Sequence, residues 1–549
     1  MGTPKQTINY KLNFVIFRHN EIKLDRYFNL PNPGLRSYFD IVRSGQPEIY
    51  RTTFAKGEDV SAVLQEWKPK VDTLSERWPT LVEFENDLAK KVGPMSVMKP
   101  LSQRMNDIDH YYEDILLSST PIDHSAVAAV IGEWSRARGV TLRSQSRTVE
   151  LMKKSTNSGS PYFTKRRKVA DDTDLVGYLL KVLKSFRNYL VPYGILVPYL
   201  VGVGKKGDHH KEDVKQRVVW MFPFSVNINE LQVYQPLIEA AQRFNLVPAW
   251  VSMEAVDKRI TDLFDTKSPN DLVVCTDFSK FDQHFNAKLQ DAALQVLRAI
   301  VTPGVTSKEW FDKVYPIKYM IPLAYDVGRV RFGKHGMGSG SGGTNCDETL
   351  AHRALQYEAA QSSGVKLNPN SQCLGDDGVL TYPGITVEDV VKAYTSHGVE
   401  MNLGKQYAST QDCTYLRRWH HKDYRVDGIC VGVYSTCRAL GRLRYLERYQ
   451  NPKYWDAKAV ALRQLSILEN VKYHPLKEQF AEFCMKRDKY RLGVDIPGFL
   501  ANIESEAEQA MDLMPDFLGY TKTLQTEGDP GPDGISNWWW IVKYLKSKA

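Results

Sequence analysis

Gln372-Cys-Leu-Gly-Asp-Asp-Gly-Val-Leu380 is the stretch that decides the fold, because it sets two adjacent acids between short apolar runs bounded by glycines. The pattern predicts a β-hairpin, since Gly375 and Gly378 permit a tight reversal of the chain. Such a turn presents Asp376 and Asp377 at its tip, where a hard cation can reach them. A Gly-Asp-Asp triplet arises by chance in roughly one in ten chains of this length, so its meaning depends on the rest of the sequence.

A second acidic tip precedes this hairpin in the chain. The apolar run at residues 272–275 predicts a buried strand that delivers Asp277 at its C-terminal end, which is where ligand sites in α/β sheets are found. Asp282 follows five residues later, in the turn that leads to a helical pattern at residues 288–300. Two carboxylates from two adjacent strands are enough for a magnesium site, because Mg²⁺ takes its other ligands from substrate oxygens and water.

Two basic residues and a glycine-rich loop are candidates for binding phosphates near such a site. Lys215 and Arg217 lead into the apolar run at residues 218–220, and strand alternation places both on one face. Two cations on one face suit a triphosphate, to which arginine binds in a bidentate manner. Residues 336–343 include five glycines and precede a predicted helix at residues 347–360. A flexible loop before a helix N-terminus favours binding of a nucleotide or backbone phosphate.

The composition indicates a soluble, globular protein that binds a polyanion. Hydrophobic residues make up 42% and charged residues 25% of the 549 residues, which is ordinary usage. The seven cysteines are odd in number and lack CxxC spacing, which favours reduced thiols over disulfides or zinc. Residues 151–220 hold 14 Lys and Arg against 6 Asp and Glu, which equals the whole net charge of +8. The most apolar run, residues 189–204, is too short and too interrupted by proline to span a bilayer, so we expect no membrane partner.

The order of these features resembles the motif series of viral RNA-dependent RNA polymerases across residues 155–420. The strings SGSGGTN, CLGDDG and TYLRRW are most similar to those of picobirnavirus polymerases, with partitivirus polymerases next. The resemblance implies an α/β (α+β) fold shaped as a right hand of fingers, palm and thumb. Its palm is expected to be an antiparallel sheet backed by helices, and its fingers and thumb to be mainly helical.

The resemblance also divides the chain. It implies an N-terminal segment at residues 1–70 that bridges fingers and thumb, and fingers at 71–225 with an insertion at 301–335. The palm is expected at 226–300 and 336–430, and the thumb and C-terminal tail at 431–549. Within that tail, Trp538, Trp539 and Trp540 are predicted either to pack in the thumb or to form a stacking platform.

The implied activity is template-directed transfer of nucleotides from NTPs, which replicates and transcribes a viral RNA genome. Family members use two Mg²⁺ ions roughly 3.5 to 4 Å apart, and Mn²⁺ is an alternative. The resemblance assigns the catalytic and metal-binding roles to Asp277, Asp376 and Asp377, with Asp377 as the supporting member. It also assigns to Lys405 the protonation of the departing pyrophosphate.

The remaining site residues fall into two groups. Asp282 matches the residue that recognises the ribose 2′-hydroxyl, and its usual Asn partner is Glu348 here, with Asn345 the nearest amide, so either is a candidate. The residues expected at the NTP are Lys211, Lys215, Arg217, Asp282, Ser339, Gly340, Thr344, Asn345 and Glu348. Those expected at RNA are Ser158, Gly159, Pro161, Lys165, Arg166, Arg167, Lys168, Tyr415, Arg417 and Arg418.

Two alternatives compete with this interpretation. A reverse transcriptase also has a palm with paired aspartates, but it places a bulky ring where this sequence has Asp282. A non-catalytic RNA-binding or capsid-associated protein explains the basic segment but not the two acidic tips. For a polymerase the expected partners are template and nascent RNA, NTPs and a viral capsid protein. We expect a monomer in the cytoplasm of the infected cell and inside the virion.

Overall fold

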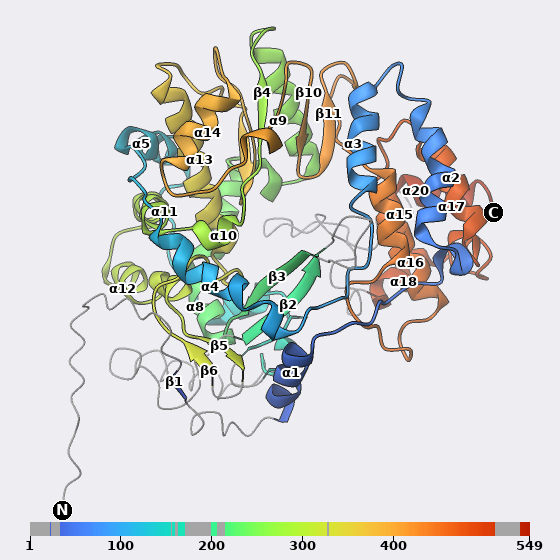
Figure 1. Ribbon diagram of the computed structural model, residues 1–549, viewed down its shortest axis with the longest axis horizontal. Coiled ribbons are helices and arrows are strands. Elements are labelled where there is room, and N and C mark those ends of the chain that lie inside the picture. Colours follow the sequence, from blue (N-terminus) through green and yellow to red (C-terminus); the bar gives the residue numbers. More distant parts are fainter. Residues whose placement is uncertain are drawn as a thin grey trace, which may run out of the picture.

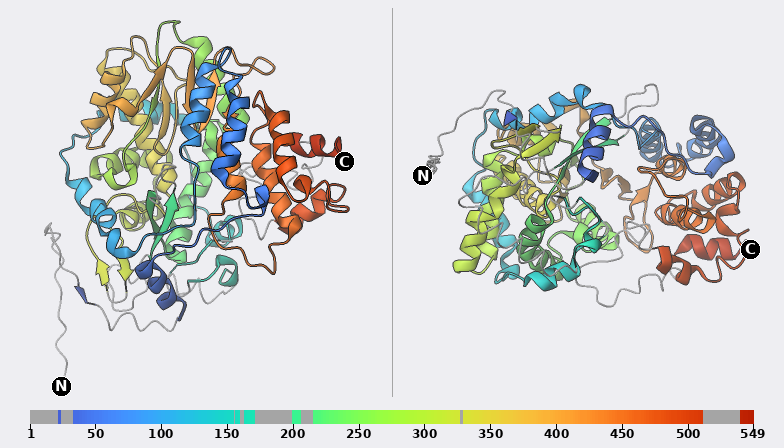
Figure 2. Two further views of the ribbon diagram at one scale, coloured as in Figure 1. Left: turned by 45° about the vertical axis from the view of Figure 1, so that its right-hand side comes forward. Right: turned by 90° about the horizontal axis from the view of Figure 1, so that it is seen from below.

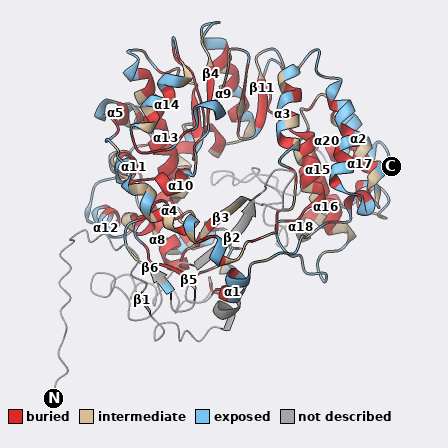
Figure 3. Cartoon of the chain, viewed as in Figure 1, coloured by how far each residue is buried: buried red, intermediate tan, exposed pale blue. Residues whose placement is uncertain are grey.

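The computed structural model describes residues 22–23, 33–154, 156–159, 163–170, 199–205, 215–326, 329–510 and 539–549. Figure 1 shows a large body of mixed helices and strands and, beside it, a smaller body made of helices. The two further views in Figure 2 show the same two bodies next to each other. Buried residues gather between the helices and the sheets of the large body and along the inner faces of the helical body (Figure 3).

A four-stranded antiparallel sheet of order β7-β8-β4-β9 forms the centre of the large body. Its strands are β7 (Gln372–Leu374), β8 (Asp377–Leu380), β4 (Val273–Thr276) and β9 (Tyr407–Ser409). All four residues of β4 are buried. Val274 packs in the core cluster on one face of the sheet, whereas Val273 and Cys275 pack in the cluster on the other. Burial on both faces explains why β4 is a continuous apolar run rather than an alternating one.

Helices cover both faces of this sheet. Leu350 and Ala354 of α13 pack in the core cluster that holds Val274, and Ile260 of α9 packs in the opposite cluster. Asn286 starts α11 as its N-cap by accepting from the Lys288 and Leu289 amides. The helices around the sheet are α5 (His124–Glu133), α8 (Phe224–Arg243), α9 (Met253–Thr266), α10 (Phe281–His284), α11 (Ala287–Ile300), α13 (Thr344–Ser362) and α14 (Val387–Thr395).

A five-stranded sheet of order β1-β6-β5-β2-β3 packs beside this core. The strand predicted to begin at Lys215 is present as β3 and pairs along its whole length with β2. Its buried core includes Trp220 and Phe222. The strands are β1 (Ile22–Lys23), β2 (Tyr199–Lys205), β3 (Lys215–Met221), β5 (Leu323–Asp326) and β6 (Arg329–Arg331). Four further helices of the large body are α1 (Pro33–Ser44), α4 (Met105–Glu113), α6 (Gln145–Leu151) and α12 (Val305–Lys313). The predicted insertion at 301–335 therefore contributes two strands to this sheet.

The helical body joins an early segment of the chain to its C-terminal part. Trp67 and Val82, from the N-terminal half, share one core with Leu440, Leu465 and other C-terminal residues. The helices of this body are α2 (Val60–Asp72), α3 (Pro79–Ala89), α15 (Thr436–Arg444), α16 (Ala457–Glu469), α17 (Lys477–Arg487), α18 (Ile503–Ala510) and α20 (Trp540–Lys546). Since α3 packs here, it lies with the predicted thumb although the predicted fingers begin at residue 71.

A three-stranded sheet lies between the two bodies in the view of Figure 1. It consists of β10 (Asp412–Tyr415), β11 (Arg418–His421) and β12 (Val433–Tyr434). Trp539 and Trp540 pack against the core of the helical body, while Trp538 lies outside the described residues. All seven cysteines are buried free thiols. Within the described ranges, no helix combines the length and the apolar character needed to cross a membrane.

Candidate active site

The predicted hairpin is present, and helix α13 determines the shape of its turn. Strands β7 and β8 pair antiparallel up to Leu374 and Asp377. Gly375 has a φ of +57°, a conformation that glycine adopts without strain. Its amide donates to Thr349 Oγ1 at 2.9 Å, and its carbonyl accepts from His352 Nδ1 at 2.8 Å. Two side chains of α13 therefore hold the main chain immediately before the paired acids.

The neighbouring strand brings Asp277 to the same place. Thr276 of β4 pairs with Gly378 of β8, so the next residue, Asp277, lies beside the hairpin tip. A Cβ atom on Gly378 would lie 2.6 Å from His352 Cε1, which explains why a residue without a side chain stands there. The carboxylates of Asp277 and Asp376 are exposed, and that of Asp377 is half-buried. The fold thus unites the two acidic tips that the sequence predicted.

The three carboxylates affect one another electrostatically. Burial and the negative charges of Asp376 and Asp277 together raise the pKa of Asp377 to about 7. Among the described residues, no three acidic, histidine or cysteine side chains already form a metal-binding cluster. Asp277 and Asp376 nevertheless fit a divalent cation, because both are exposed hard oxygen ligands at one sheet edge and substrate oxygens complete such a shell.

The loop that carries Lys405 is attached to Asp277 by a residue that the sequence did not reveal. The Asp277 amide donates to Gln406 Oε1 at 2.8 Å, and Gln406 Nε2 donates back to the Asp277 carbonyl at 2.9 Å. Gln406 Nε2 also donates to the Asn402 carbonyl at 2.9 Å. Lys405 itself is exposed in a short 3₁₀ turn, Leu403–Lys405. This cation is therefore tethered next to the acidic site by hydrogen bonds of its neighbour.

The structure distinguishes between the two candidate partners of Asp282. Glu348 is buried on α13, and burial together with the charge and hydrogen bond of Asp282 raises its pKa well above the ordinary range. A raised pKa favours the neutral form of Glu348, in which the carboxyl is a hydrogen-bond donor to Asp282, while its Oε1 has no partner within the described residues. Asn345 is exposed, and its Oδ1 accepts from the Trp250 indole at 2.7 Å. Glu348, rather than Asn345, is therefore the residue that contacts Asp282.

The glycine loop before α13 is fixed by buried polar groups of α8. The Glu230 carboxylate accepts from the Ser341 hydroxyl and from the Gly342 amide. Asn227 Nδ2 donates to the Gly340 carbonyl at 3.3 Å, and a Cβ on Gly340 would overlap the Trp220 carbonyl oxygen of β3. No spacing in the sequence pointed to Glu230 or Asn227, since both stand more than 100 residues before the loop.

Two predicted nucleotide ligands use their hydroxyls within the protein instead. Ser339 Oγ donates to the Val218 carbonyl at 3.4 Å, and Thr344 Oγ1 donates to the Gly338 carbonyl at 3.2 Å. Both bonds hold the glycine loop in place. The structure therefore shows these two residues shaping the loop, and their contact with an NTP stays a prediction.

The cationic strand faces the same region. The Arg217 side chain is exposed. Arg217 acts electrostatically on the buried hydroxyl of Tyr111, as do Asp282 and Glu348, which places all three side chains near one tyrosine. The main chain of Lys215 lies two residues earlier on β3, and Lys211 lies outside the described residues.

Comparisons with known proteins agree with this geometry. A family model described as viral RNA-dependent RNA polymerase matches residues 108–436. A protein named potential RNA-dependent RNA polymerase, from Human picobirnavirus strain Human/Thailand/Hy005102/-, is 60% identical over 531 residues, which cover 95% of this chain and 98% of that protein. The chain belongs to the viral RNA-dependent RNA polymerase family.

Solved structures of such polymerases share the fold. The crystal structure of the polymerase of a human picobirnavirus is 57% identical, with a TM-score of 0.86 over 96% of this chain and 98% of that chain. An insertion-loop deletion mutant of a human picobirnavirus polymerase is 55% identical, with a TM-score of 0.85 over the same shares. The fold is thus the right hand of fingers, palm and thumb, and the four-stranded sheet corresponds to the expected palm.

Some residues of this polymerase that were predicted to contact RNA are buried or form hydrogen bonds within the protein. Ser158 is fully buried, where its amide donates to the Thr164 carbonyl and its carbonyl accepts from the Phe224 amide. Gly159 is also buried, and Arg166 Nη2 donates to Asn227 Oδ1 at 2.6 Å. Lys165 and Lys168 are exposed, Arg167 is half-buried, and Pro161 lies outside the described residues. The two lysines are accordingly the most accessible cations of this group.

The hairpin formed by β10 and β11 requires a correction. Arg418 was expected to contact RNA, but it is 3% exposed and forms two hydrogen bonds with Asp257, at 2.8 and 3.0 Å. Tyr415 is also buried. Both residues lie in strands whose side chains pack against α9, so their polar groups face the protein interior. Arg417, in the turn between the strands, is exposed and stays a predicted RNA contact.

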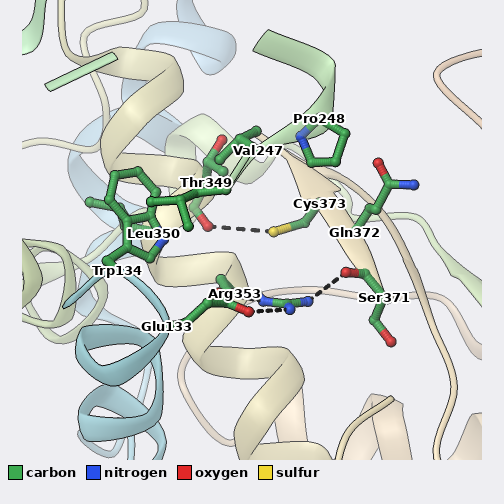
Figure 4. Close-up of a pocket in the computed structure, with 11 residues that line it drawn as sticks. Glu133, Trp134, Val247, Pro248, Thr349, Leu350, Arg353, Ser371, Gln372 and Cys373 are labelled. Atoms are coloured by element: carbon green, nitrogen blue, oxygen red, sulfur yellow. Dashed lines mark hydrogen bonds and ion pairs between the residues drawn. The ribbon is translucent and has the colours of Figure 1, made fainter. Parts of the chain in front are cut away.

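Figure 4 shows a small pocket behind β7, lined by residues of α5, α13 and β7, among them Glu133, Arg353 and Cys373. Arg353 forms part of its wall, pairs with Glu133 and donates to the Ser371 carbonyl at 2.7 Å. Cys373 Sγ points to the Thr349 carbonyl at 3.5 Å. The polar groups in this wall bind one another and so anchor the chain that leads into the Gly-Asp-Asp turn.

Proposed function

We propose that this RNA-dependent RNA polymerase adds NTPs to a growing strand at a site formed by Asp277 and Asp376, and so replicates and transcribes a viral RNA genome. The observation that carries the proposal is the pairing of Thr276 with Gly378, which sets both acids at one edge of the palm sheet. Polymerases of this family use divalent metal ions. We propose Mg²⁺ as the ion, with Mn²⁺ as a substitute, because the donors are carboxylates.

Asp277 and Asp376 would hold the metal ions, with Asp377 as their half-buried neighbour. The ions supply activation of the 3′-hydroxyl and compensation of charge on the leaving phosphates. Arg217 binds the triphosphate with its guanidinium and offsets the charge that develops there. Asp282 and the neutral Glu348 recognise the ribose, since Oε1 of Glu348 lacks a partner among the described residues. Lys405, tethered through Gln406, gives its proton to the departing pyrophosphate.

The deciding experiment replaces Asp376 with Asn and measures NTP incorporation on an RNA template. Because the variant loses a charged metal ligand, we expect synthesis to fall about a thousandfold. RNA affinity and melting temperature should stay near those of the unchanged protein. Asp389→Asn, an exposed acid on α14, serves as the matched control and should leave synthesis unaltered. Unchanged synthesis by Asp376→Asn would contradict the assignment.

The wider setting of the enzyme is also a proposal. We propose that it acts as a monomer, in the cytoplasm of the infected cell and inside the virion, where a capsid protein is its partner. The similarity to picobirnavirus polymerases supports this setting. Light scattering of the purified chain tests the monomer, and co-sedimentation with purified virus particles tests the capsid contact.

A further inference from the structure

The turn between β10 and β11 adopts a conformation that its residues disfavour. Tyr415 pairs with Arg418, so Leu416 and Arg417 are the two central residues of a tight hairpin. Their φ angles are +52° and +58°, in the left-handed region. Two-residue hairpins use Asn and Gly there, because a Cβ atom makes this region unfavourable for other residues. Strain of this kind persists only where the surrounding structure holds the turn.

Asp377 is one of the groups that hold this turn. The Leu416 amide donates to Asp377 Oδ2 at 2.8 Å, across 39 residues of sequence. The Leu416 side chain packs against the core cluster that also contains Val379 and Cys413. The second acid of the Gly-Asp-Asp hairpin therefore reaches the tip of a neighbouring hairpin, whereas Asp376 remains exposed.

The geometry of the turn presents one cation outward. Arg418 is buried in its ion pair with Asp257, and Tyr415 is buried in the core. Arg417 lies between them in sequence and is exposed. Asp377 and Arg417 also interact electrostatically, so the cation stays near the acidic site. An exposed arginine beside the end of a growing strand is suited to a phosphodiester of that strand, because phosphate contacts position RNA without reading its sequence.

We propose that Asp377 is a positioning residue, whose carboxylate oxygen holds the Leu416–Arg417 turn so that Arg417 meets the phosphate backbone of the nascent RNA strand. This inference rests on the proposed RNA contact of Arg417 and deepens the proposed function. It separates the paired acids by task, with Asp376 holding metal and Asp377 joining the metal site to the RNA-contacting hairpin.

The test measures binding of an RNA duplex with a recessed 3′ end by fluorescence anisotropy in EDTA, so that metal binding plays no part. We expect Arg417→Ala to weaken binding about fivefold. The slope of log affinity against log salt concentration should become less steep by about one, since one phosphate contact is lost. Asp377→Ala should cause the same loss and the same change in salt dependence. The double variant should bind no more weakly than either single variant. Arg298→Ala, an exposed arginine on α11, is the matched control and should bind normally.

Two further variants separate positioning from charge and from folding. Asp377→Asn loses the charge but keeps an acceptor oxygen, and it should bind RNA within about twofold of the unchanged protein. Asp377→Glu keeps the charge but displaces the acceptor, and it should bind as weakly as Asp377→Ala. Equal binding by the Ala and Asn variants, or losses that multiply in the double variant, would overturn the proposal. Because all binding is measured without metal, failure of the Asp376 assignment would leave this result unaffected.

Discussion

Glu348 shows how one residue alters the chemistry of sugar recognition without altering the fold. The sequence resemblance implied an amide partner for Asp282 where this chain has Glu348, and an ionised Glu348 beside Asp282 would repel it. Burial raises the pKa of Glu348 and so favours its neutral form, which is a hydrogen-bond donor as an amide is. The Asp282 carboxylate is thereby held in place with one Glu348 oxygen still lacking a partner among the described residues.

Glu348→Ala tests this role through the preference for NTPs over dNTPs. Losing a buried hydrogen bond to a charged group costs about 1.5 kcal/mol, so the ratio of kcat/KM for UTP to that for dUTP should fall roughly tenfold. Glu348→Gln keeps a donor and should retain the preference. Asn345→Ala is the comparison, because Asn345 contacts Trp250 rather than Asp282. A larger loss with Asn345→Ala would assign sugar selection to the amide instead.

The sequence identified the acids of the site more readily than the residues that hold them. Asp277 and Asp376 each follow or precede a short apolar strand, which is a local pattern. Gln406, Trp250 and Glu230 act through hydrogen bonds to residues about 95 to 130 positions away, and no local pattern marks such a residue. Their roles depend on side-chain placement, which only the folded chain defines.

At the scale of elements, two strands followed from local runs of apolar residues. The run at residues 272–275 became β4, and Lys215 begins β3 as expected. The expectation that Tyr415 and Arg418 contact RNA was wrong, because both side chains are buried. The two-residue turn leaves Arg417 at the tip and returns Arg418 to the interior, where Asp257 neutralises it. A partner on α9 could not be inferred from the hairpin sequence.

The glycine loop yields a prediction about the contact between two elements. Gly340→Ala places a methyl group against the Trp220 carbonyl of β3, and a paired strand cannot move away cheaply. We expect the loop to shift and NTP incorporation to fall at least about tenfold, measured as kcat/KM. Gly132→Ala, in the open on α5, is the matched control and should raise the free energy of unfolding by about 0.5 to 1 kcal/mol with unchanged activity. Normal activity of Gly340→Ala would show that the loop tolerates the added methyl group.

At the scale of the whole molecule, an early segment of the chain packs against the C-terminal part in the helical body. Residues from Phe54 to Met95 share one core with residues from Cys437 to Leu545. The expected boundary at residue 70 reflected sequence order, whereas the hydrophobic faces of α2 and α3 share one core with helices more than 340 residues later in the chain. Amphipathic patterns indicate that a helix has a buried face, but they do not name the helix that covers it. Long-range pairing of this kind was therefore the least predictable part of the fold.

Glu85 of α3 connects the same two parts of the chain through buried hydrogen bonds. It is fully buried and accepts from the Ser435 hydroxyl and the Thr436 and Cys437 amides at the start of α15. It also accepts from His474 Nε2, which lies between α16 and α17. Burial by itself would raise the pKa of Glu85, but the hydrogen bond and charge of His474, with the Ser435 and Thr436 hydroxyls, lower it to about 2. The folded state thus binds the ionised carboxylate much better than the unfolded chain does.

The depressed pKa of Glu85 fixes the sign of a pH prediction. A carboxyl with a folded pKa of about 2 and an ordinary value of 4.5 stabilises the fold above pH 4.5, by roughly 3 kcal/mol. This contribution is lost as the pH falls from 4.5 toward 2. Glu85→Gln should therefore lower the melting temperature clearly at pH 7, and the difference from the unchanged protein should shrink below pH 4.5. The exposed Glu83→Gln on the same helix should melt normally at both pH values, and a Glu85→Gln deficit that stays constant down to pH 3 would show that the network acts through packing rather than charge.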